Sequence, residues 1–242
     1  MKKNNMEKIY HKNVLEDLKD FNNHAGIKKS SFDWKKSCED AAKDWNKKKP
    51  KNEADYIKYY EQSKDYIEAM ATYNALGKKL RLIEKICKVL GLVSPNHKII
   101  DFGCGVGSDS LHLKALGFDV IAMDVKGVAL EFAKYRFKKH GMKIPVVVSN
   151  SKSKLPKCDV ILSMDTLEHV YDPYKTLDTF FEANPKALLL TTAFGVHDHD
   201  NQGGIPMHTD HKVHKVEKYI EEHGYKKKKL YMPFPPRLFI RK

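Results

Sequence analysis

Residues 98–124 read KIIDFGCGVGSDSLHLKALGFDVIAMD, and this stretch decides the fold. A short apolar run ends in Asp101, a helix is predicted over residues 108–116, and a second apolar run ends in Asp124. Between the first run and the helix lie three glycines at alternate positions, Gly103, Gly105 and Gly107. A strand, a glycine loop, a helix, a second strand and an acid, in this order, predict half of a nucleotide-binding α/β unit.

The glycine loop suits a ligand that lies directly against the main chain. Glycines at alternate positions allow a sharp turn and leave no Cβ between the backbone and the ligand. The free amides at the start of the following helix, at Ser108, would then face the bound molecule. A carboxylate at the end of the second strand can accept hydrogen bonds from both hydroxyls of a ribose, and Asp124 occupies that position.

The spacing of the glycines differs from the dinucleotide fingerprint G-x-G-x-x-G. Counted from Gly103, the third glycine of that fingerprint would fall on Ser108. The pattern is instead D-x-G-x-G-x-G with Asp101 at its head, which suits a ligand with a cationic end better than a pyrophosphate. At these residues the sequence resembles the class I S-adenosylmethionine-dependent methyltransferases. The alternative is a glycine-rich turn in another Rossmann-like protein.

The resemblance implies a Rossmann-like α/β fold with a mostly parallel seven-stranded sheet, helices on both faces and an N-terminal helical extension. We expect residues 1–90 to form this extension, as a lid over the cofactor cleft, and residues 91–242 to bind S-adenosylmethionine. Tyr59, Tyr60 and Tyr66 of the lid either touch the cofactor or substrate or only pack the helical layer. The expected cofactor-binding residues are Asp101, Gly103, Gly105, Gly107, Asp124, Val125, Asn150, Ser151 and Met164.

Composition favours a cytoplasmic α/β protein. The 242 residues are 41% hydrophobic, which is enough for a core. No apolar run approaches the roughly 18 residues that a membrane helix needs, and the N-terminus has no apolar signal-peptide region. The four cysteines are scattered without a C-x-x-C pair, which suits a reducing compartment and argues against a disulfide framework.

The net charge of +13 is unevenly distributed along the chain. Residues 1–90 carry a surplus of 7 positive charges, residues 91–200 are neutral, and residues 201–242 carry a surplus of 6. Basic ends of this kind are compatible with RNA or another polyanion as a partner. A solvated surface is the favoured interpretation, because only four of the basic residues are arginine and specific phosphate contacts favour arginine.

A second motif, SMDTLEHVYDP at residues 163–173, follows the predicted fourth strand. Ligands of α/β sheets bind at the carboxyl ends of the strands, so we expect this turn in the cofactor cleft. The string resembles the D-x-L-E-H-V-x-D-P segment of small-molecule methyltransferases, including the ubiquinone-biosynthesis type. It lacks the N/D-P-P-Y/F pattern of the methyltransferases that act on amino groups of nucleic-acid bases.

Within this motif, Asp165, Glu168 and His169 are spaced at i, i+3 and i+4, which would place them on one face of a helix. Two carboxylates and an imidazole make a plausible half-site for a divalent metal ion. In the ubiquinone-type O-methyltransferases a matching acid-x-x-Glu-His is associated with metal binding, and the resemblance extends this role to these three residues. The alternative is that Glu168 and His169 make structural hydrogen bonds only.

The segment after the predicted fifth strand is rich in histidine, between His197 and His214. Histidine is the usual general base near neutral pH. His199, His208 and His211 are therefore the leading candidates for the base that activates a small-molecule oxygen or nitrogen acceptor. Two alternatives stay open: methylation of RNA or another polyanion, and binding of S-adenosylmethionine or another nucleotide without catalysis.

Overall fold

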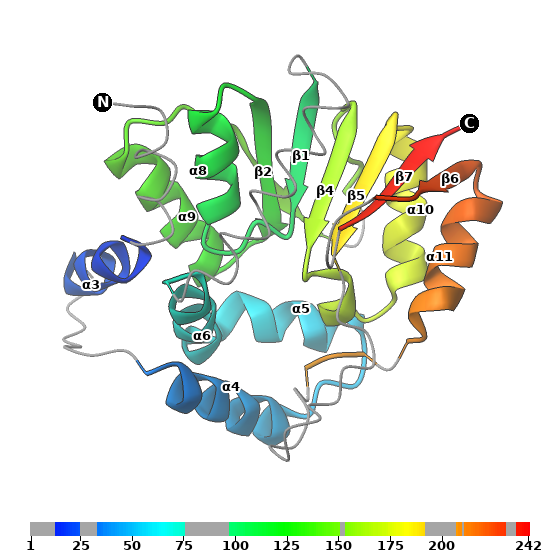
Figure 1. Cartoon of the computed structure of the whole chain (residues 1–242). Coiled ribbons are helices and arrows are strands. Elements are labelled where there is room, and N and C mark those ends of the chain that lie inside the picture. Colours follow the sequence, from blue (N-terminus) through cyan, green and yellow to red (C-terminus); the bar gives the residue numbers. More distant parts are fainter. Residues whose placement is uncertain are drawn as a thin grey trace.

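The computed structural model describes residues 13–24, 33–75, 97–150, 153–191, 207–209, 211–230 and 236–242. Its centre is a seven-stranded sheet in the order β3-β2-β1-β4-β5-β7-β6 (Figure 1). The strands are β1 (Lys98–Phe102), β2 (Asp119–Val125), β3 (Val146–Ser149), β4 (Val160–Met164), β5 (Ala187–Thr191), β6 (Tyr225–Lys228) and β7 (Arg237–Arg241). β1 to β5 pair in parallel, whereas β7 is antiparallel to β5 and β6 is antiparallel to β7. The predicted mostly parallel sheet is confirmed.

The central strands are buried on both faces, as parallel strands with helical crossovers must be. β4 (VILSM) and β5 (ALLLT) are buried at every position. Alternate residues serve two separate cores: Ile100 packs with Phe180 on one side of the sheet, and Ile99 packs with Leu113 on the other. The runs of apolar residues in these strands therefore reflect burial on both faces of the sheet.

Helices cover both faces of the sheet (Figure 1). The hydrophobic core on one face includes residues of α10 (Pro173–Ala183) and α11 (Val213–Glu222). On the other face lie α8 (Ser108–Ala115) and α9 (Val128–Lys139), whose apolar residues pack together. This arrangement is the predicted one. No described helix is long and apolar enough to cross a membrane.

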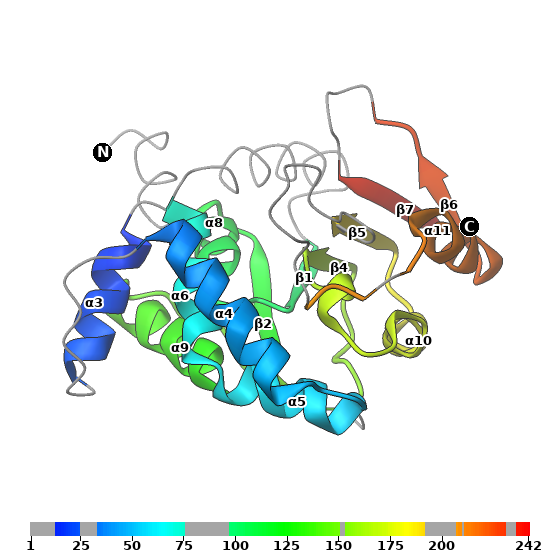
Figure 2. The ribbon, with the colours of Figure 1, turned by 90° about the horizontal axis from the view of Figure 1, so that it is seen from below.

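Among the described residues, four N-terminal helices precede β1: α3 (Val14–His24), α4 (Trp34–Lys48), α5 (Glu53–Gln62) and α6 (Lys64–Ala75). Two of them begin at side-chain caps, because Asp33 accepts a hydrogen bond from the Lys36 amide and Asn52 accepts one from the Asp55 amide. Helices α4, α5 and α6 gather below one end of the sheet (Figures 1 and 2). The helix expected to lead into the first strand, over residues 80–90, lies outside the described residues.

The register brings the carboxyl ends of three strands together. Phe102 at the end of β1 pairs with Met123 of β2 on one side and with Ser163 of β4 on the other. The glycine loop, Asp124 and the 163–173 motif therefore leave the sheet at the same end. It is the end that α4, α5 and α6 cover (Figure 1).

Candidate functional site

A cavity of about 800 Å³ lies between the carboxyl ends of β1, β2 and β4 and the N-terminal helices. The glycine loop and the 163–173 motif form one side of it, and α4, α5 and α6 contribute to the other. Its helical side is aromatic and apolar, with Trp34, Tyr56, Tyr60, Tyr66, Met70 and Tyr73 among the lining residues. The cavity thus combines a polar floor from the sheet with an apolar cover from the helices.

The glycine loop approaches its neighbours too closely for side chains. Gly103 has φ of +74°, and a Cβ there would lie 2.3 Å from the Thr166 side chain. Gly105 has φ of +53°, and a Cβ there would meet the Met70 sulfur of α6 at 3.0 Å. Both glycines line the cavity. The backbone of the loop is therefore open to a ligand, while α6 lies directly over it.

Gly107 packs closely against α9 and does not line the cavity. Its φ is +74°, and a Cβ would lie 2.7 Å from the ring of Phe137 and 3.0 Å from Cβ of Ala133. We expect Gly107→Ala to lower the free energy of unfolding by about 2–4 kcal/mol, through left-handed strain and overpacking together. Gly117→Ala is the matched control, because Gly117 has φ of +93° with no atom within 4 Å.

Urea denaturation of both glycine variants measures this difference. Gly117→Ala should lose only about 1–2 kcal/mol, the cost of the left-handed conformation alone. Equal losses of unfolding free energy in the two variants would show that the contact of Gly107 with α9 does not contribute to the difference in stability.

Asp124 lines the cavity at the end of β2 and already binds the loop. Its carboxylate accepts hydrogen bonds from the amide of Gly105, at 2.7 Å, and from the amide of Val125, also at 2.7 Å. A half-buried carboxylate at this position can hold the hydroxyls of a ribose while it fixes the loop.

The cavity is also lined by three further predicted cofactor residues, Val125, Asn150 and Met164, as a cofactor site would require. Ser151 lies outside the described residues.

Asp101 has a different place from the other predicted cofactor residues. It is buried, and its carboxylate accepts a 2.5 Å hydrogen bond from the hydroxyl of Ser110 in α8. It is not among the residues that line the cavity. The acid at the head of the glycine motif thus ties β1 to the helix that follows the loop.

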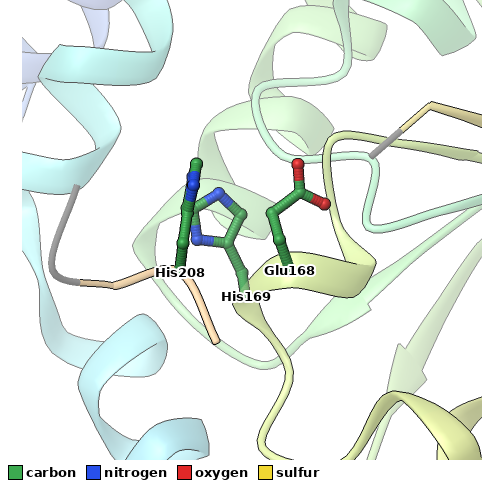
Figure 3. A group of neighbouring side chains, drawn as sticks. All are labelled: Glu168, His169 and His208. Atoms are coloured by element: carbon green, nitrogen blue, oxygen red, sulfur yellow. The ribbon is translucent and has the colours of Figure 1, made fainter. Parts of the chain in front are cut away.

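Three side chains form a polar cluster in the cavity: Glu168, His169 and His208. One potential ligand atom from each lies within 4.8 Å of the others. Figure 3 shows the three side chains reaching into one space from two separate segments. Glu168 is fully buried, and the rings of His169 and His208 have centroids 4.6 Å apart.

Backbone contacts hold the two segments of this cluster together. The amide of Thr209 donates to the carbonyl of Glu168 at 2.7 Å, and the Thr209 hydroxyl donates to the same carbonyl at 3.2 Å. His208 precedes Thr209, so these bonds bring it to the cluster. Glu168 and His169 belong to a short 3₁₀ helix, η1 (Leu167–His169), that directly follows β4 and its turn.

Asp165 is not part of the cluster, which corrects the expectation that a helix would group it with Glu168 and His169. It precedes η1, with φ of +50°, so helical spacing does not apply to it. Its carboxylate accepts a hydrogen bond from the Thr191 hydroxyl at 2.9 Å. Asp165 still lines the cavity, at the end of β4.

The three histidines predicted as candidate bases differ in their position relative to the cavity. His208 lines the cavity, whereas His211 is not among the lining residues, and its ring packs edge-on against Tyr174 with centroids 5.6 Å apart. His199 lies outside the described residues. His169, expected either as a metal ligand or as a structural hydrogen-bonding residue, joins His208 as a candidate base.

Tyr60 of α5 connects the helical cover to this cluster. Its hydroxyl lies 3.1 Å from Nδ1 of His169, and the ring of Tyr66 also packs against His169. Burial raises the pKa of both the Tyr60 and Tyr66 phenols, so both remain protonated at neutral pH. Tyr60 therefore orients His169 as a hydrogen-bond partner, and neither phenol acts as a base. Tyr59 instead donates to the carbonyl of Ala41, within the helical layer.

Contacts at the rim of the cavity join residues far apart in the sequence. Lys175 of α10 pairs with Glu53 of α5 at 2.6 Å, and Tyr171 packs edge-on against Tyr56. These contacts were not predicted from the sequence. No local pattern could have revealed the ion pair, because its partners are 122 positions apart.

The family model described as a methyltransferase domain matches residues 58–227. Among curated proteins, the ubiquinone biosynthesis O-methyltransferase of Pelagibacter ubique is 36% identical over 95 residues, which cover 38% of this chain and 38% of that protein. The mitochondrial ubiquinone biosynthesis O-methyltransferase of Schizosaccharomyces pombe is 36% identical over 94 residues, 35% of this chain and 33% of that protein. The chain thus spans between 33% and 38% of the length of these relatives.

Solved structures share the fold at low sequence identity. The magnesium protoporphyrin IX methyltransferase of Synechocystis with bound S-adenosylhomocysteine superposes with a TM-score of 0.58 at 18% identity, over 72% of this chain and 87% of that chain. Human N-acetylserotonin methyltransferase in complex with S-adenosylmethionine gives 0.53 at 14% identity, over 78% and 56%. Because the family match covers most of its length, the chain belongs to the methyltransferase domain family, with the class I S-adenosylmethionine-dependent fold that its glycine loop predicted.

Proposed function

We propose that the protein transfers a methyl group from S-adenosylmethionine to a hydroxyl oxygen of a small, largely apolar acceptor. The observation that carries this proposal is that Glu168, His169 and His208 share one cavity with the glycine loop and Asp124. The loop and Asp124 suit the adenosyl end of the donor, and the cluster suits the acceptor. The names of the two curated relatives, both O-methyltransferases, support oxygen as the acceptor atom.

The cluster supplies the chemistry that a hydroxyl acceptor needs. Attack on a methyl sulfonium requires an in-line oxygen about 3 Å from the methyl carbon, and the hydroxyl must lose its proton at or before attack. The imidazoles of His169 and His208 can take that proton near neutral pH. Because Tyr60 occupies Nδ1 of His169, we assign the proton transfer by this residue to Nε2.

The aromatic cover supports an apolar acceptor. Tyr56, Tyr66 and Trp34 line the cavity on its helical side, and Tyr60 reaches the cluster from the same side. Rings of this kind exclude water and pack against flat or aliphatic groups. A phenol or catechol with an apolar substituent matches both the cluster and the cover.

The same three side chains fit a divalent cation. One carboxylate and two imidazoles are ligand types that suit first-row divalent metals. Metal-bound histidine typically donates a hydrogen bond from its second ring nitrogen, and Nδ1 of His169 has the Tyr60 hydroxyl as a partner. A cation held by Glu168, His169 and His208 would polarise the acceptor oxygens when bound.

Melting temperatures test this cation site. We expect Mn²⁺ or Zn²⁺ to raise the melting temperature of the wild-type protein, by an amount equivalent to about 2.7 kcal/mol at a concentration 100 times the Kd. Glu168→Gln should lose the shift, while Glu182→Gln, an exposed acid on α10, should keep it. Absence of any shift, together with full activity in EDTA, would leave proton transfer to the imidazoles alone.

Transfer of labelled methyl groups tests the proposed reaction. The protein is incubated with methyl-labelled S-adenosylmethionine and either a catechol probe, such as 3,4-dihydroxybenzoate or caffeate, or structured RNA. We expect label in the catechols and none in RNA. Label in RNA alone, with activity that falls steeply between low and moderate salt, would contradict the proposal.

A further inference from the structure

Arg136 of α9 is fully buried, at 0% exposure, and reaches the glycine loop. Its Nη1 donates to the carbonyl of Val106 at 2.7 Å and to the hydroxyl of Ser108 at 2.8 Å. These partners lie on either side of Gly107. One guanidinium nitrogen therefore fixes the last turn of the loop, where the backbone enters α8.

The other side of the guanidinium holds α3. Nε of Arg136 donates to the carboxylate of Asp17 at 2.9 Å, across 119 positions of sequence. Asp17 is 1% exposed and also binds Lys139 at 2.9 Å and His140 at 2.8 Å. Burial alone would raise the pKa of Asp17, but the hydrogen bonds from His140, Lys139 and Arg136 outweigh it and lower this pKa. The carboxylate thus remains ionised at neutral pH and keeps Arg136 in place.

Apolar contacts connect the same two elements independently. Val14 and Leu18 of α3 belong to one buried cluster with Val106 of the glycine loop and Phe132 of α9. The cavity lining includes no described residue of α3. Helix α3 therefore contacts the loop from the side away from the ligand and has no direct access to the site.

A buried ion pair is an expensive way to gain stability alone, since apolar side chains of similar volume often stabilise a core as well or better. What the guanidinium adds is direction, because its planar fork fixes several acceptors at once. Here the acceptors are a carboxylate of the N-terminal extension and two groups of the ligand-binding loop. The geometry therefore suits coupling between the position of the N-terminal extension and the position of the ligand-binding loop.

We propose that Arg136 is a positioning residue for the glycine loop and that Asp17 holds it there, so that docking of α3 sets the affinity for the methyl donor. This inference rests on the proposed use of S-adenosylmethionine. It assigns a function to an N-terminal helix that does not contact the ligand. By linkage, binding of the donor or its product must in turn stabilise the docked α3.

Calorimetric titration with S-adenosylhomocysteine tests the inference. We expect Arg136→Met and Asp17→Asn each to raise the Kd by about tenfold, within the roughly 5–150-fold range of coupled sites. Arg136→Lys keeps the charge but loses the fork, so its Kd should lie between those of Arg136→Met and the wild type. Lys134→Met is the matched control, because Lys134 lies on the same helix and pairs with the exposed Glu131.

Hydrogen exchange tests whether ligand binding and docking of α3 are coupled, which a purely structural role of Arg136 and Asp17 would not require. Saturation with S-adenosylhomocysteine should slow amide exchange in residues 14–24 of the wild-type protein, and this protection should be lost in Asp17→Asn. Should Arg136→Met fail to fold, Asp17→Asn and the wild-type exchange data still decide the question. A lowered melting temperature in Asp17→Asn with an unchanged Kd, or no added protection of α3 on binding, would overturn the inference alone. Failure of the wild-type protein to bind S-adenosylhomocysteine would overturn the proposed function, and this inference with it.

Discussion

Replacing His169 by alanine lowers kcat by about 10²- to 10⁴-fold with a catechol probe, the range expected for loss of a general acid–base group. The reason is that His169 combines a place in the cavity, a neighbouring imidazole in His208 and a hydrogen bond between its Nδ1 and the Tyr60 hydroxyl that fixes its orientation. Binding of S-adenosylhomocysteine should change little, because the proposed donor site is built from the glycine loop and Asp124, whereas His169 belongs to η1. Single-turnover rates with labelled donor, alongside a titration with product, separate the two effects.

His214→Ala is the matched control for this prediction. His214 is exposed on α11 and does not line the cavity, so its loss should leave kcat within about twofold. Tyr60→Phe should cause a smaller loss than His169→Ala, since it removes the orienting hydroxyl and keeps the imidazole. A large loss in His211→Ala with none in His169→Ala would return the base to the later histidine that the sequence favoured.

Asp124→Ala weakens binding of S-adenosylhomocysteine by about 1–3 kcal/mol, or roughly 5- to 150-fold, the scale of hydrogen bonds to a charged group. The substitution has two effects. It removes the carboxylate that suits the ribose hydroxyls, and it frees the Gly105 amide, which in the wild-type protein donates to that carboxylate at 2.7 Å. Isothermal titration of the variant against the wild-type protein measures the sum.

Asp119→Ala controls for the loss of an acid from the same strand. Asp119 begins β2, at the opposite end from the cavity, and is exposed. We expect its substitution to leave the affinity unchanged. Equal effects of the two substitutions would indicate a general electrostatic contribution and would remove Asp124 from the proposed ribose site.

Much of the fold follows from local sequence because its determinants are close together in the chain. The glycine loop, its flanking strands and the helix after it all lie within residues 98–125, and each has a distinct pattern. The nearly all apolar sequence of β5 indicates burial on both faces, which in turn indicates a parallel sheet. Gly103 and Gly105 line the cavity as expected, because the same turn that needs glycine also exposes the backbone.

The polar cluster could be predicted only in part. Glu168 and His169 are neighbours in sequence, so they stay together in any fold. The third member was wrongly expected to be Asp165, because the i, i+3, i+4 argument assumed a helix from residue 165, whereas η1 begins two residues later, at Leu167. His208 takes that place because Thr209 bonds to the carbonyl of Glu168, a contact across 41 positions that no local pattern encodes.

The burial of individual charges could not be predicted either. Residues 91–200 have no net charge, yet Arg136 within them is among the most deeply buried of the described side chains. Its partner Asp17 comes from a different helix, 119 positions away. Composition gives the number of charges, and only the packing of α3 against α9 reveals which of them are paired inside.

Calorimetric titration with S-adenosylhomocysteine measures whether the cavity above the glycine loop binds the methyl donor. We expect saturable binding at one site per chain, weakened in Asp124→Ala and unchanged in Asp119→Ala, with no binding of NAD under the same conditions. Saturable binding of NAD without binding of S-adenosylhomocysteine would contradict this expectation.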